Sequence, residues 1–338
     1  MRKLSNLSAP FVRTETTSRH MTMDVLLAAV PLCAFSVFNY GVRPLWVVLL
    51  TILSALVCEA GCCLILRKPL STLTDGSAAV TGAIIGLAMS PLVPMWMPML
   101  GAAFAIIVVK APFGGYGRNV FNPAAAGIAI LSYCFPQSMF TYPAIDKSVI
   151  LPADFYVDPT TVITETSIAS QLRAGANPGL TGMQLLTGDF AGPIGGTATL
   201  ILLACAAFLM FRRTTSTCMT VCYLGTCFII ACLVPYSGVG GTYSAAYQMC
   251  AGYVLFTGVF LLNDPVTSPR YLLGRVFYGV IAAILVMLLQ HIGRVEAGSC
   301  FAILIMNTLS PIIDRWSWHG RRRLLRLFRM RREVASNE

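Results

Sequence analysis

The densest group of residues able to do chemistry lies between Lys110 and Pro123, in the run KAPFGGYGRNVFNP. Its glycines permit sharp backbone turns and the close approach of a ligand. Its side-chain donors suit an anionic or polar ring system such as a flavin, and its proline can begin a helix with an electropositive amino end. The glycines and donors are Gly114, Gly115, Gly117, Arg118, Asn119 and Asn122. A tight turn between two helices would have the same composition, so glycine content alone leaves both interpretations open.

Two of the acidic residues in or beside long apolar runs, where a charge is unfavourable, are candidates for function. Glu59 lies inside one run, and Asp264 follows another in the sequence Leu262-Asn-Asp-Pro-Val-Thr267. Ionisable groups in such places commonly line ion paths or cofactor cavities, so both residues are candidates for an ion path. Asp264 has a second interpretation, because an aspartate before a proline is also typical of a helix cap.

The third candidate segment is the polar stretch 138–189, which separates two apolar halves of the chain. A connection of this length is uncommon unless it is functional. It contains a hydroxyl-rich strip that runs from Asp158 through Thr161 and Thr164 to Thr166. A solvated loop is the default interpretation, but an exposed hydroxyl beside an acid is also a place where an external enzyme can modify a side chain.

The 12 cysteines and 3 histidines do not form a metal-binding pattern. Nearly all the cysteines lie within apolar runs, and no C-x-x-C pair occurs. The histidines are far apart and near the ends of apolar runs. We therefore expect no metal site, no iron–sulfur ligation by this chain alone and no disulfide framework.

The elements that must position these residues are membrane-spanning helices. Hydrophobic residues make up 56% of the chain and charged residues only 11%, whereas a soluble domain carries about 25% charged residues. Apolar runs predict an all-α polytopic membrane protein of about ten spans, of which the third and fifth are short and expected to be broken or re-entrant. The predicted spans are 22–41, 44–66, 76–91, 91–111, 123–137, 190–211, 217–235, 244–262, 273–292 and 297–313.

The net charge of +10 indicates the orientation of the chain. If the amino terminus is cytoplasmic, twenty of the 24 Lys and Arg residues, Lys110 included, fall on the cytoplasmic side. Only Arg43, Lys147, Arg173 and Arg294 fall outside. This asymmetry predicts that both termini are cytoplasmic. It also accounts for the positive charge without a nucleic-acid partner, and the basic tail suits a lipid surface.

The topology divides the chain into five parts. A cytoplasmic segment (1–21) precedes a first half of five spans (22–137), the outer loop (138–189), a second half of five spans (190–314) and a basic cytoplasmic tail (315–338). Because five is odd, the second half begins on the opposite side of the membrane. The two halves are then inverted relative to each other, as in many transporters.

Four segments together resemble the D subunit of the Rnf-type ion-translocating oxidoreductase complex, which is related to the B subunit of the sodium-translocating NADH:quinone oxidoreductase. They are Asp75-Gly-Ser-Ala, the run from Lys110 to Ala124, the run from Leu262 to Thr267, and Asn307-Thr-Leu-Ser-Pro-Ile-Ile-Asp314. The resemblance covers nearly the whole chain, and its second and third segments are specific in order and separation.

The resemblance implies a covalent flavin in the outer loop. Members of the family carry FMN on a threonine through a phosphoester, which an external flavin transferase forms. The family pattern, Asp-x-x-Ser/Thr-x-Ala-Thr, places its acid on Asp158, its hydroxyl on Thr161 and its acceptor on Thr164. Ile163 replaces the small alanine of the pattern, and Glu165-Thr166 replaces the usual Pro-Leu. These departures leave Thr166 as an alternative acceptor and leave open a chain without covalent flavin.

The resemblance also implies a function. Within such a complex, electrons pass between ferredoxin and NAD, coupled to the translocation of Na⁺ or H⁺ across the plasma membrane. The chain would act with the other subunits of the complex, and a second, non-covalent flavin such as riboflavin would lie near Gly114 to Asn122. The alternative is a small-solute channel of urea-transporter-like inverted-repeat fold without a redox role, because a fold alone does not fix a function.

Overall fold

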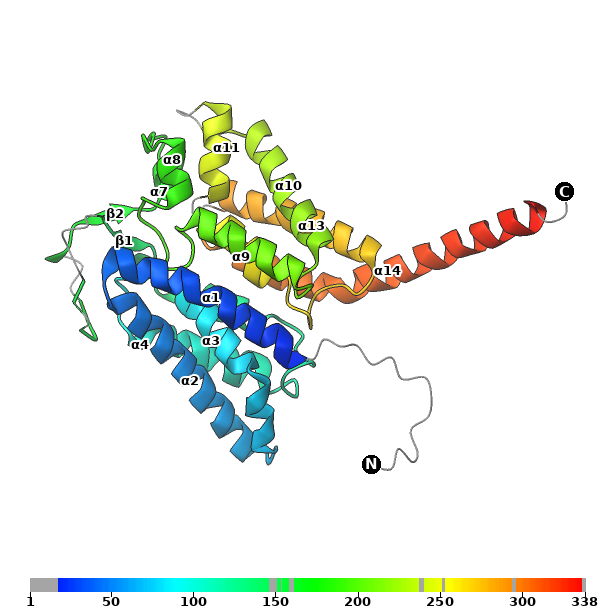
Figure 1. Cartoon of the computed structure of the whole chain (residues 1–338), viewed down its shortest axis with the longest axis horizontal. Coiled ribbons are helices and arrows are strands. Elements are labelled where there is room, and N and C mark those ends of the chain that lie inside the picture. The colour runs from blue at the N-terminus through cyan, green and yellow to red at the C-terminus, as the bar shows by residue number, and fades with distance from the viewer. Residues whose placement is uncertain are drawn as a thin grey trace.

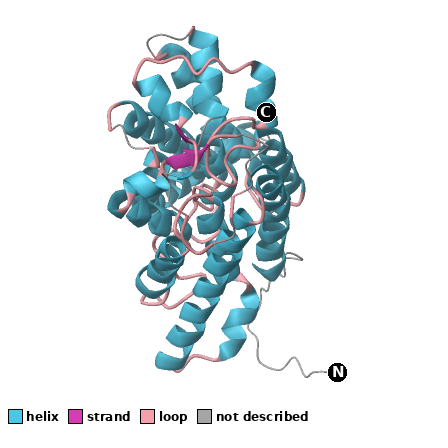
Figure 2. Ribbon diagram, turned by 90° about the vertical axis from the view of Figure 1, so that its left-hand side faces the viewer, coloured by secondary structure: helices cyan, strands magenta, loops and turns pink. Residues whose placement is uncertain are grey.

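The computed structural model describes residues 18–145, 151–152, 154–157, 161–236, 240–250, 253–293 and 296–335. Helices dominate these residues, as expected (Figures 1 and 2). The first half of the chain forms α1 (Ser18–Tyr40), α2 (Arg43–Ile65), the 3-10 helix η1 (Leu70–Asp75), α3 (Ser77–Leu87), α4 (Trp96–Phe104), the π-helix η2 (Ala105–Lys110), α5 (Pro123–Cys134) and α6 (Pro136–Met139).

The outer loop and the second half follow. The loop contains two short strands, an addition to the all-helical prediction: β1 (Thr141–Pro143) and β2 (Thr164–Thr166), then α7 (Ile168–Arg173) and α8 (Gly182–Thr187). The second half forms α9 (Thr199–Phe211), α10 (Thr217–Leu233), α11 (Gly241–Cys250), α12 (Tyr253–Phe256), the π-helix η4 (Thr257–Leu261), α13 (Leu272–His291) and α14 (Gly298–Ala335).

The helices pack in two groups. In the first group α2 lies against α1, α3 and α4, and in the second α13 lies between α10 and α14. The pairs α1–α9 and α5–α14 join the groups, and Figure 1 shows α1 and α9 side by side between them. One buried core of apolar side chains runs through both groups.

Three described helices, α1, α2 and α13, are long and apolar enough to cross a bilayer. The 23 residues of α1 span about 34 Å at 1.5 Å per residue, against roughly 30 Å of hydrocarbon. A fourth span is formed if α11 and the helix Tyr253–Leu261, which are bent by 53° at their junction, count together. The other apolar helices of the described chain are shorter, so these lengths fall short of the ten predicted spans.

The third, fourth and sixth predicted spans differ from the observed helices. The third ends at Leu87, the fourth begins only at Trp96, and the sixth begins at Thr199 and not at 190. The intervening residues 88–95 and 190–198 are irregular but buried almost throughout. Hydropathy did not distinguish them from helix, because it reports burial in an apolar environment and not backbone conformation.

The second half of the chain satisfies the carbonyl groups at the end of α3. The amide of Gly195 donates to Leu87 O (2.6 Å) and that of Ile194 donates to Met89 O (2.9 Å). The hydroxyl of Tyr253 donates to Ala88 O (2.6 Å). Buried irregular backbone is tolerated within a membrane protein only with such partners.

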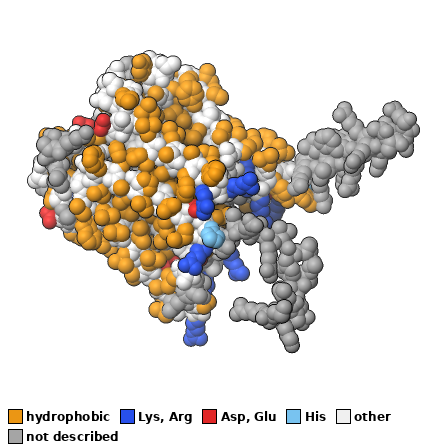
Figure 3. Space-filling model, in the orientation of Figure 1, with side chains coloured by type: hydrophobic (Ala, Val, Ile, Leu, Met, Phe, Trp, Pro, Cys, Tyr) orange, Lys and Arg blue, Asp and Glu red, His pale blue; other side chains and the backbone are white. Residues whose placement is uncertain are grey.

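The exterior of the helical body is largely apolar, as Figure 3 shows for one face. On that face Lys and Arg side chains gather at the end where α1 begins and α14 projects, and some acidic side chains are visible at the opposite end (Figures 1 and 3). The strands β1 and β2 lie at the end of the molecule opposite to this group of Lys and Arg side chains (Figures 1 and 3).

Helices α2 and α3 approach so closely that Gly82 has no room for a side chain. A Cβ atom there would lie 2.7 Å from Ile52 Cα and 2.8 Å from Thr51 O, both of them backbone atoms. Gly82→Ala is therefore expected to destabilise the protein by about 1–3 kcal/mol, because the two backbones must separate. Thermal unfolding of the purified full chain measures this, with Gly61→Ala as control, since a Cβ at Gly61 meets no atom within 4 Å. Equal midpoints for the two variants would contradict the close approach.

Candidate functional site

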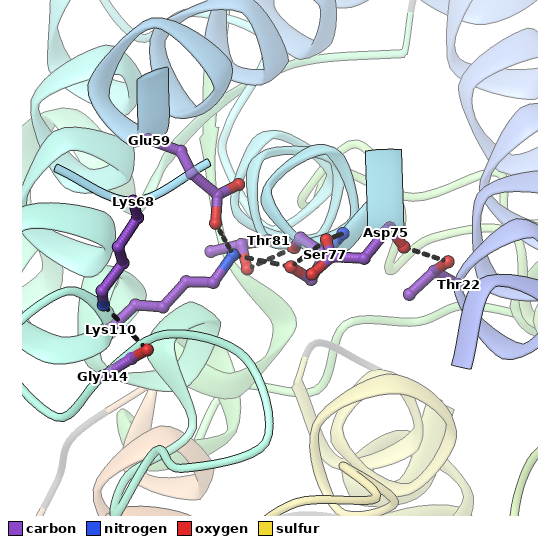
Figure 4. A network of polar contacts seen from close by, with 8 residues as sticks. All are labelled: Thr22, Glu59, Lys68, Asp75, Ser77, Thr81, Lys110 and Gly114. Atoms are coloured by element: carbon purple, nitrogen blue, oxygen red, sulfur yellow. Dashed lines mark hydrogen bonds and ion pairs between the residues drawn. The ribbon is translucent and has the colours of Figure 1, made fainter. Parts of the chain in front are cut away.

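Glu59 is joined to a buried lysine at the basic end of the molecule (Figure 4). Lys110 Nζ forms an ion pair with Glu59 Oε1 and donates a hydrogen bond to Ser77 Oγ at 2.6 Å. Lys110 is 2% exposed and Glu59 is 7% exposed. The second carboxylate oxygen of Glu59, Oε2, is buried without a hydrogen-bond partner.

The start of α3 holds this pair in place. Asp75 accepts hydrogen bonds from Ser77 N (3.0 Å) and Ser77 Oγ (2.7 Å), and its own carbonyl accepts one from Thr22 of α1 (2.7 Å). Gly76 between them has φ of 75°, a left-handed conformation that favours glycine. The Asp75-Gly-Ser sequence therefore forms a turn that places the Ser77 hydroxyl against the ammonium group (Figure 4).

The charge pattern places Lys110 among the basic residues on the cytoplasmic side. In the structure, however, its side chain is buried and not solvated. It is the last residue of the π-helix η2, and its side chain points inward to Glu59 instead of into solvent. The wide turn of a π-helix is a frequent feature of functional sites. Arg43, counted outside, is likewise buried, where its guanidinium donates to Pro91 O (2.8 Å) and Val93 O (2.9 Å).

Two cavities adjoin at Lys110 and Tyr116, which line both. The one we call the large cavity, whose empty space including its open mouth is about 730 Å³, lies between the two helix groups. Its polar lining includes Thr22, Ser77, Thr81, Asn119, Asn122, Thr214, Thr215, Asn263 and Asp264. The smaller, of about 510 Å³, is lined by Glu59, Asp75, Lys68 and the glycine loop, among others. Burial raises the pKa of the Tyr116 phenol to about 12, so a neutral hydroxyl lies between the cavities.

The structure divides the predicted glycine-rich site between these cavities. Gly114, Gly115 and Gly117 all have positive φ, as a tight turn requires. Gly114 and Gly115 line the smaller cavity, where Lys68 Nζ donates to Gly114 O (2.8 Å). Gly117 lines neither cavity, and its role in the described structure is conformational.

The three predicted donors of the segment have different environments. The Arg118 side chain lies beside Gly114 and lines neither cavity. Asn122 caps α5 by accepting from Ala124 N (3.0 Å), and its amide donates to the Leu261 carbonyl (3.0 Å). Asn119 lines the large cavity, and its buried Oδ1 has no partner. Of the three, Asn119 is the donor and acceptor best placed for a ligand.

Asp264 lines the large cavity but caps no helix. Its carboxylate accepts from Val266 N (3.2 Å) and Thr267 Oγ1 (3.0 Å), which holds a turn, and the next helix begins only at Leu272. Asp264 therefore caps a turn, but the helix expected to begin at Pro265 is not formed in the described structure. Burial raises the pKa of this carboxyl group against the opposing effect of the two hydrogen bonds. The side-chain oxygen Oδ1 of its neighbour Asn263 accepts a hydrogen bond from Ser216 N, in the residue before α10 (3.0 Å).

Asn307 links the segment that ends at Asn122 to the segment that ends at Thr267. The sequence did not predict this role. With its amide oriented to satisfy both ends, Asn307 accepts from Asn122 N (2.8 Å) and donates to Thr267 Oγ1 (3.3 Å) and Tyr278 OH (3.0 Å). Lys110 was missed in the same way. Its pairing with Glu59 was indicated only by the presence of a lysine at the end of one apolar run and a glutamate inside another.

The predicted flavin acceptors lie on an exposed strand. β2 pairs with β1 in antiparallel register, with Thr164 opposite Pro143 and Thr166 opposite Thr141. Thr164 and Thr166 are exposed and point to the same face, since side chains alternate along a strand. Thr161 is exposed too, whereas Asp158 lies outside the described residues. Ile163 is 70% exposed, so its bulk lies at the surface beside Thr164.

A buried carboxyl group anchors the chain just after this strand. Glu296, in the turn between α13 and α14, accepts from Ser167 Oγ at 2.6 Å and pairs with Arg173 at 3.5 Å. Burial raises the pKa of the Glu296 carboxyl, and the Ser167 hydrogen bond and Arg173 partly oppose this rise. Tyr142 and Tyr253 line the same pocket of about 350 Å³.

The raised pKa predicts a pH-dependent anchor. An acid that holds its proton more tightly when folded gives stability that is present below its ordinary value of 4.5 and lost as pH rises through the raised value. Hydrogen-exchange protection of α7, corrected for the intrinsic rate, should therefore fall as pH rises above 4.5. Glu296→Gln should remove this fall, and Glu165→Gln, on the exposed strand, should keep it. An unchanged pH profile in Glu296→Gln would refute the assignment.

Comparison with known proteins gives one consistent result. The model of the NQR2, RnfD, RnfE family matches residues 5–321. The D subunit of the proton-translocating ferredoxin:NAD(+) oxidoreductase complex of Clostridium ljungdahlii is 29% identical over 312 residues, which cover 92% of this chain and 93% of the relative. The D subunits of the ion-translocating oxidoreductase complexes of Cronobacter sakazakii and Halorhodospira halophila are 32% and 30% identical, covering 92% and 94% of this chain and 96% of each relative. The chain belongs to the NQR2, RnfD, RnfE family.

Proposed function

We propose that this chain is the flavin-carrying membrane subunit of a redox-driven ion pump, in which electrons pass between ferredoxin and NAD as Na⁺ or H⁺ crosses the membrane. The strongest support is the family match along nearly the whole chain, with relatives named as the D subunits of such complexes. In this role the chain acts with the other subunits of the complex and is not catalytic alone. Its contribution is to place and tune flavin.

The proposed orientation puts both termini in the cytoplasm and the loop of Thr164 outside the plasma membrane, with ten spans in two inverted halves. The gathering of Lys and Arg side chains at one end of the visible face supports it (Figure 3). An outer Thr164 would be accessible to an external flavin transferase. Several of the ten spans would then be interrupted around a central site. They would be built from the shorter helices, the π-helices and the buried irregular segments.

The outer threonines fit a covalently attached FMN. A phosphoester requires a hydroxyl that a transferase can reach, and the hydroxyl-bearing residues Thr164 and Thr166 are both exposed on a strand held by β1. When bound, FMN would supply electron-transfer chemistry. The chain's own part is positional, because the Ser167–Glu296 hydrogen bond fixes the residue after the strand.

The large cavity fits a second, non-covalent flavin such as riboflavin. This cavity lies between the two helix groups and combines apolar walls with a few polar groups, as is usual for ligand sites. Val25, Val259 and Phe260 give it apolar walls, and the unpartnered Asn119 Oδ1 is a polar atom that a ligand would satisfy. Asn119 would orient such a ring, while Asn122 maintains the helix behind it.

The same two cavities support the proposed ion path. Asp264 lines the larger and Glu59 the smaller, and Lys110 lines both. Acidic groups beside adjoining cavities at the basic end of the molecule give a cation successive oxygen ligands.

A vesicle experiment tests the proposed function. The complex containing this chain is reconstituted, reduced ferredoxin and NAD are added, and NADH formation and ion uptake are followed together. Ion uptake that needs both substrates, with a fluorescent flavin band on this chain in a denaturing gel, is the expected result. Downhill flux of a small solute without an electron donor, and a chain without flavin, would instead identify a channel.

A further inference from the structure

The ammonium group of Lys110 lies among oxygen atoms that would also suit a free cation. It contacts Glu59 Oε1 and Ser77 Oγ, and Ser77 in turn donates to Asp75 Oδ1 at 2.7 Å (Figure 4). Carboxylate and hydroxyl oxygens are the ligands that hard cations prefer. Lysine differs from a free cation in being tied to the chain by a flexible four-carbon stem.

Glu59 has a further oxygen available to a ligand. Its Oε2 is buried without a hydrogen-bond partner, although the residue is only 7% exposed. Buried polar atoms are nearly always satisfied, so an exception calls for a specific explanation. Glu59 lines the smaller cavity together with Asp75, so a cation that entered this cavity would meet carboxylate oxygens.

Lys110 is placed so that its movement would connect the two cavities. It lines both, and its backbone ends the π-helix η2 before the positive-φ glycines Gly114 and Gly115. Lys68 holds this loop from the other side through Gly114 O. A rotation of the Lys110 side chain toward the large cavity would free Glu59 without moving a helix.

We propose that Lys110 is a tethered counter-cation, which neutralises Glu59 until a small monovalent cation, with Na⁺ as the probe, takes its place. This inference rests on the proposed ion-pumping function. The exchange keeps one positive charge beside the Glu59 carboxylate, and the displaced ammonium group turns toward the large cavity, which the acidic Asp264 also lines. The exchange thereby avoids a buried unpaired Glu59, a state that is strongly destabilising. Lys110 is thus a residue that sets which cation binds and when.

The test removes the tethered cation and asks whether Na⁺ replaces it. In the purified complex carrying Lys110→Met, the thermal midpoint is compared in NaCl and in choline chloride at equal ionic strength and neutral pH. Saturating Na⁺ should raise it by about 5 °C or more, because a ligand that binds only the folded state stabilises it. The wild-type midpoint should change by much less, because Lys110 competes. Equal midpoints of Lys110→Met in the two salts would overturn the proposal.

Two further variants keep the test decisive. Lys110→Met with Glu59→Gln buries neither charge, so it should be stable and insensitive to Na⁺; a Na⁺ effect that persists there would overturn the assignment to Glu59. If Lys110→Met does not fold in either salt, the same comparison in Lys110→Gln decides. A midpoint that responds to pH alone also overturns the proposal, since a protonated Glu59 needs no cation.

The outcome is separable from that of the proposed function. Coupled ion uptake by the wild-type complex, with no Na⁺ effect on Lys110→Met, would remove the exchange and leave the pump. A Na⁺ effect in a complex that shows no redox-driven uptake would leave a cation site and remove the pump.

Discussion

Thr164→Ala is expected to reduce the in-gel flavin fluorescence of this chain to background, whereas Thr164→Ser retains it. The phosphoester needs a hydroxyl, and Thr164 is the position that the family pattern matches. The residue is exposed on a paired strand, so its replacement should leave the fold intact. The measurement is fluorescence of the denatured band at equal protein load, with the transferase present.

Thr166→Ala is the matched control for this result. Thr166 is exposed on the same strand and points to the same face, two residues away. Its replacement should leave the fluorescence unchanged. Loss of the signal in Thr166→Ala, with retention in Thr164→Ala, would move the acceptor to Thr166. A signal that survives both changes together would exclude this strand as the attachment site.

Glu59→Gln and Asp264→Asn are expected to lower coupled ion uptake by about tenfold or more, while the flavin remains attached. Each change removes a negative charge beside a cavity and keeps the size of the side chain. Asp264→Asn keeps an oxygen that can accept from Val266 N, and the new amide group can donate to Thr267 Oγ1, so the turn should survive. Ion uptake in vesicles, per electron transferred from ferredoxin to NAD, measures the effect.

Asp314→Asn serves as the control for the loss of an acidic charge. Asp314 accepts from Arg270 N at 3.0 Å and lines neither cavity. The Asp314→Asn variant should therefore show the same coupled ion uptake as the wild type. Glu59→Gln leaves Lys110 without its counter-charge, which can destabilise the fold by several kcal/mol, so its thermal midpoint must be measured beside its transport. Unchanged coupled uptake in both acid variants would remove these residues from the path.

Much of the fold follows from hydropathy. The long apolar runs predict α1, α2 and α13, and the expected short third and fifth spans correspond to α3 and α5. The buried irregular segments were not predicted, because small and apolar residues such as those of 190–198 suit a buried loop as well as a helix. Their conformation depends on hydrogen bonds to residues about a hundred positions away, as between Ile194 and Met89.

The candidate site could be predicted in composition but not in detail. Asn119 and Asn122 are the same residue type three positions apart, yet one has an unpartnered oxygen and the other caps α5. The difference arises because only Asn122 directly precedes the helix, although both residues line the large cavity. Lys110 and Glu59 are 51 positions apart, and only the packing of η2 beside α2 brings the two charges together.

The carbonyl groups of residues 87–89 have a consequence for biosynthesis. Their donors are Gly195, Tyr253 and Ile194, all of which follow the outer loop in the chain. At about 5–20 residues per second, α3 emerges from the ribosome roughly 5–20 s before the first of these donors. Until then the carbonyl groups at the end of α3 must accept hydrogen bonds from water or from the insertion machinery. The first half of the chain can therefore enter the membrane early, but it cannot reach its final structure before the second half has been made.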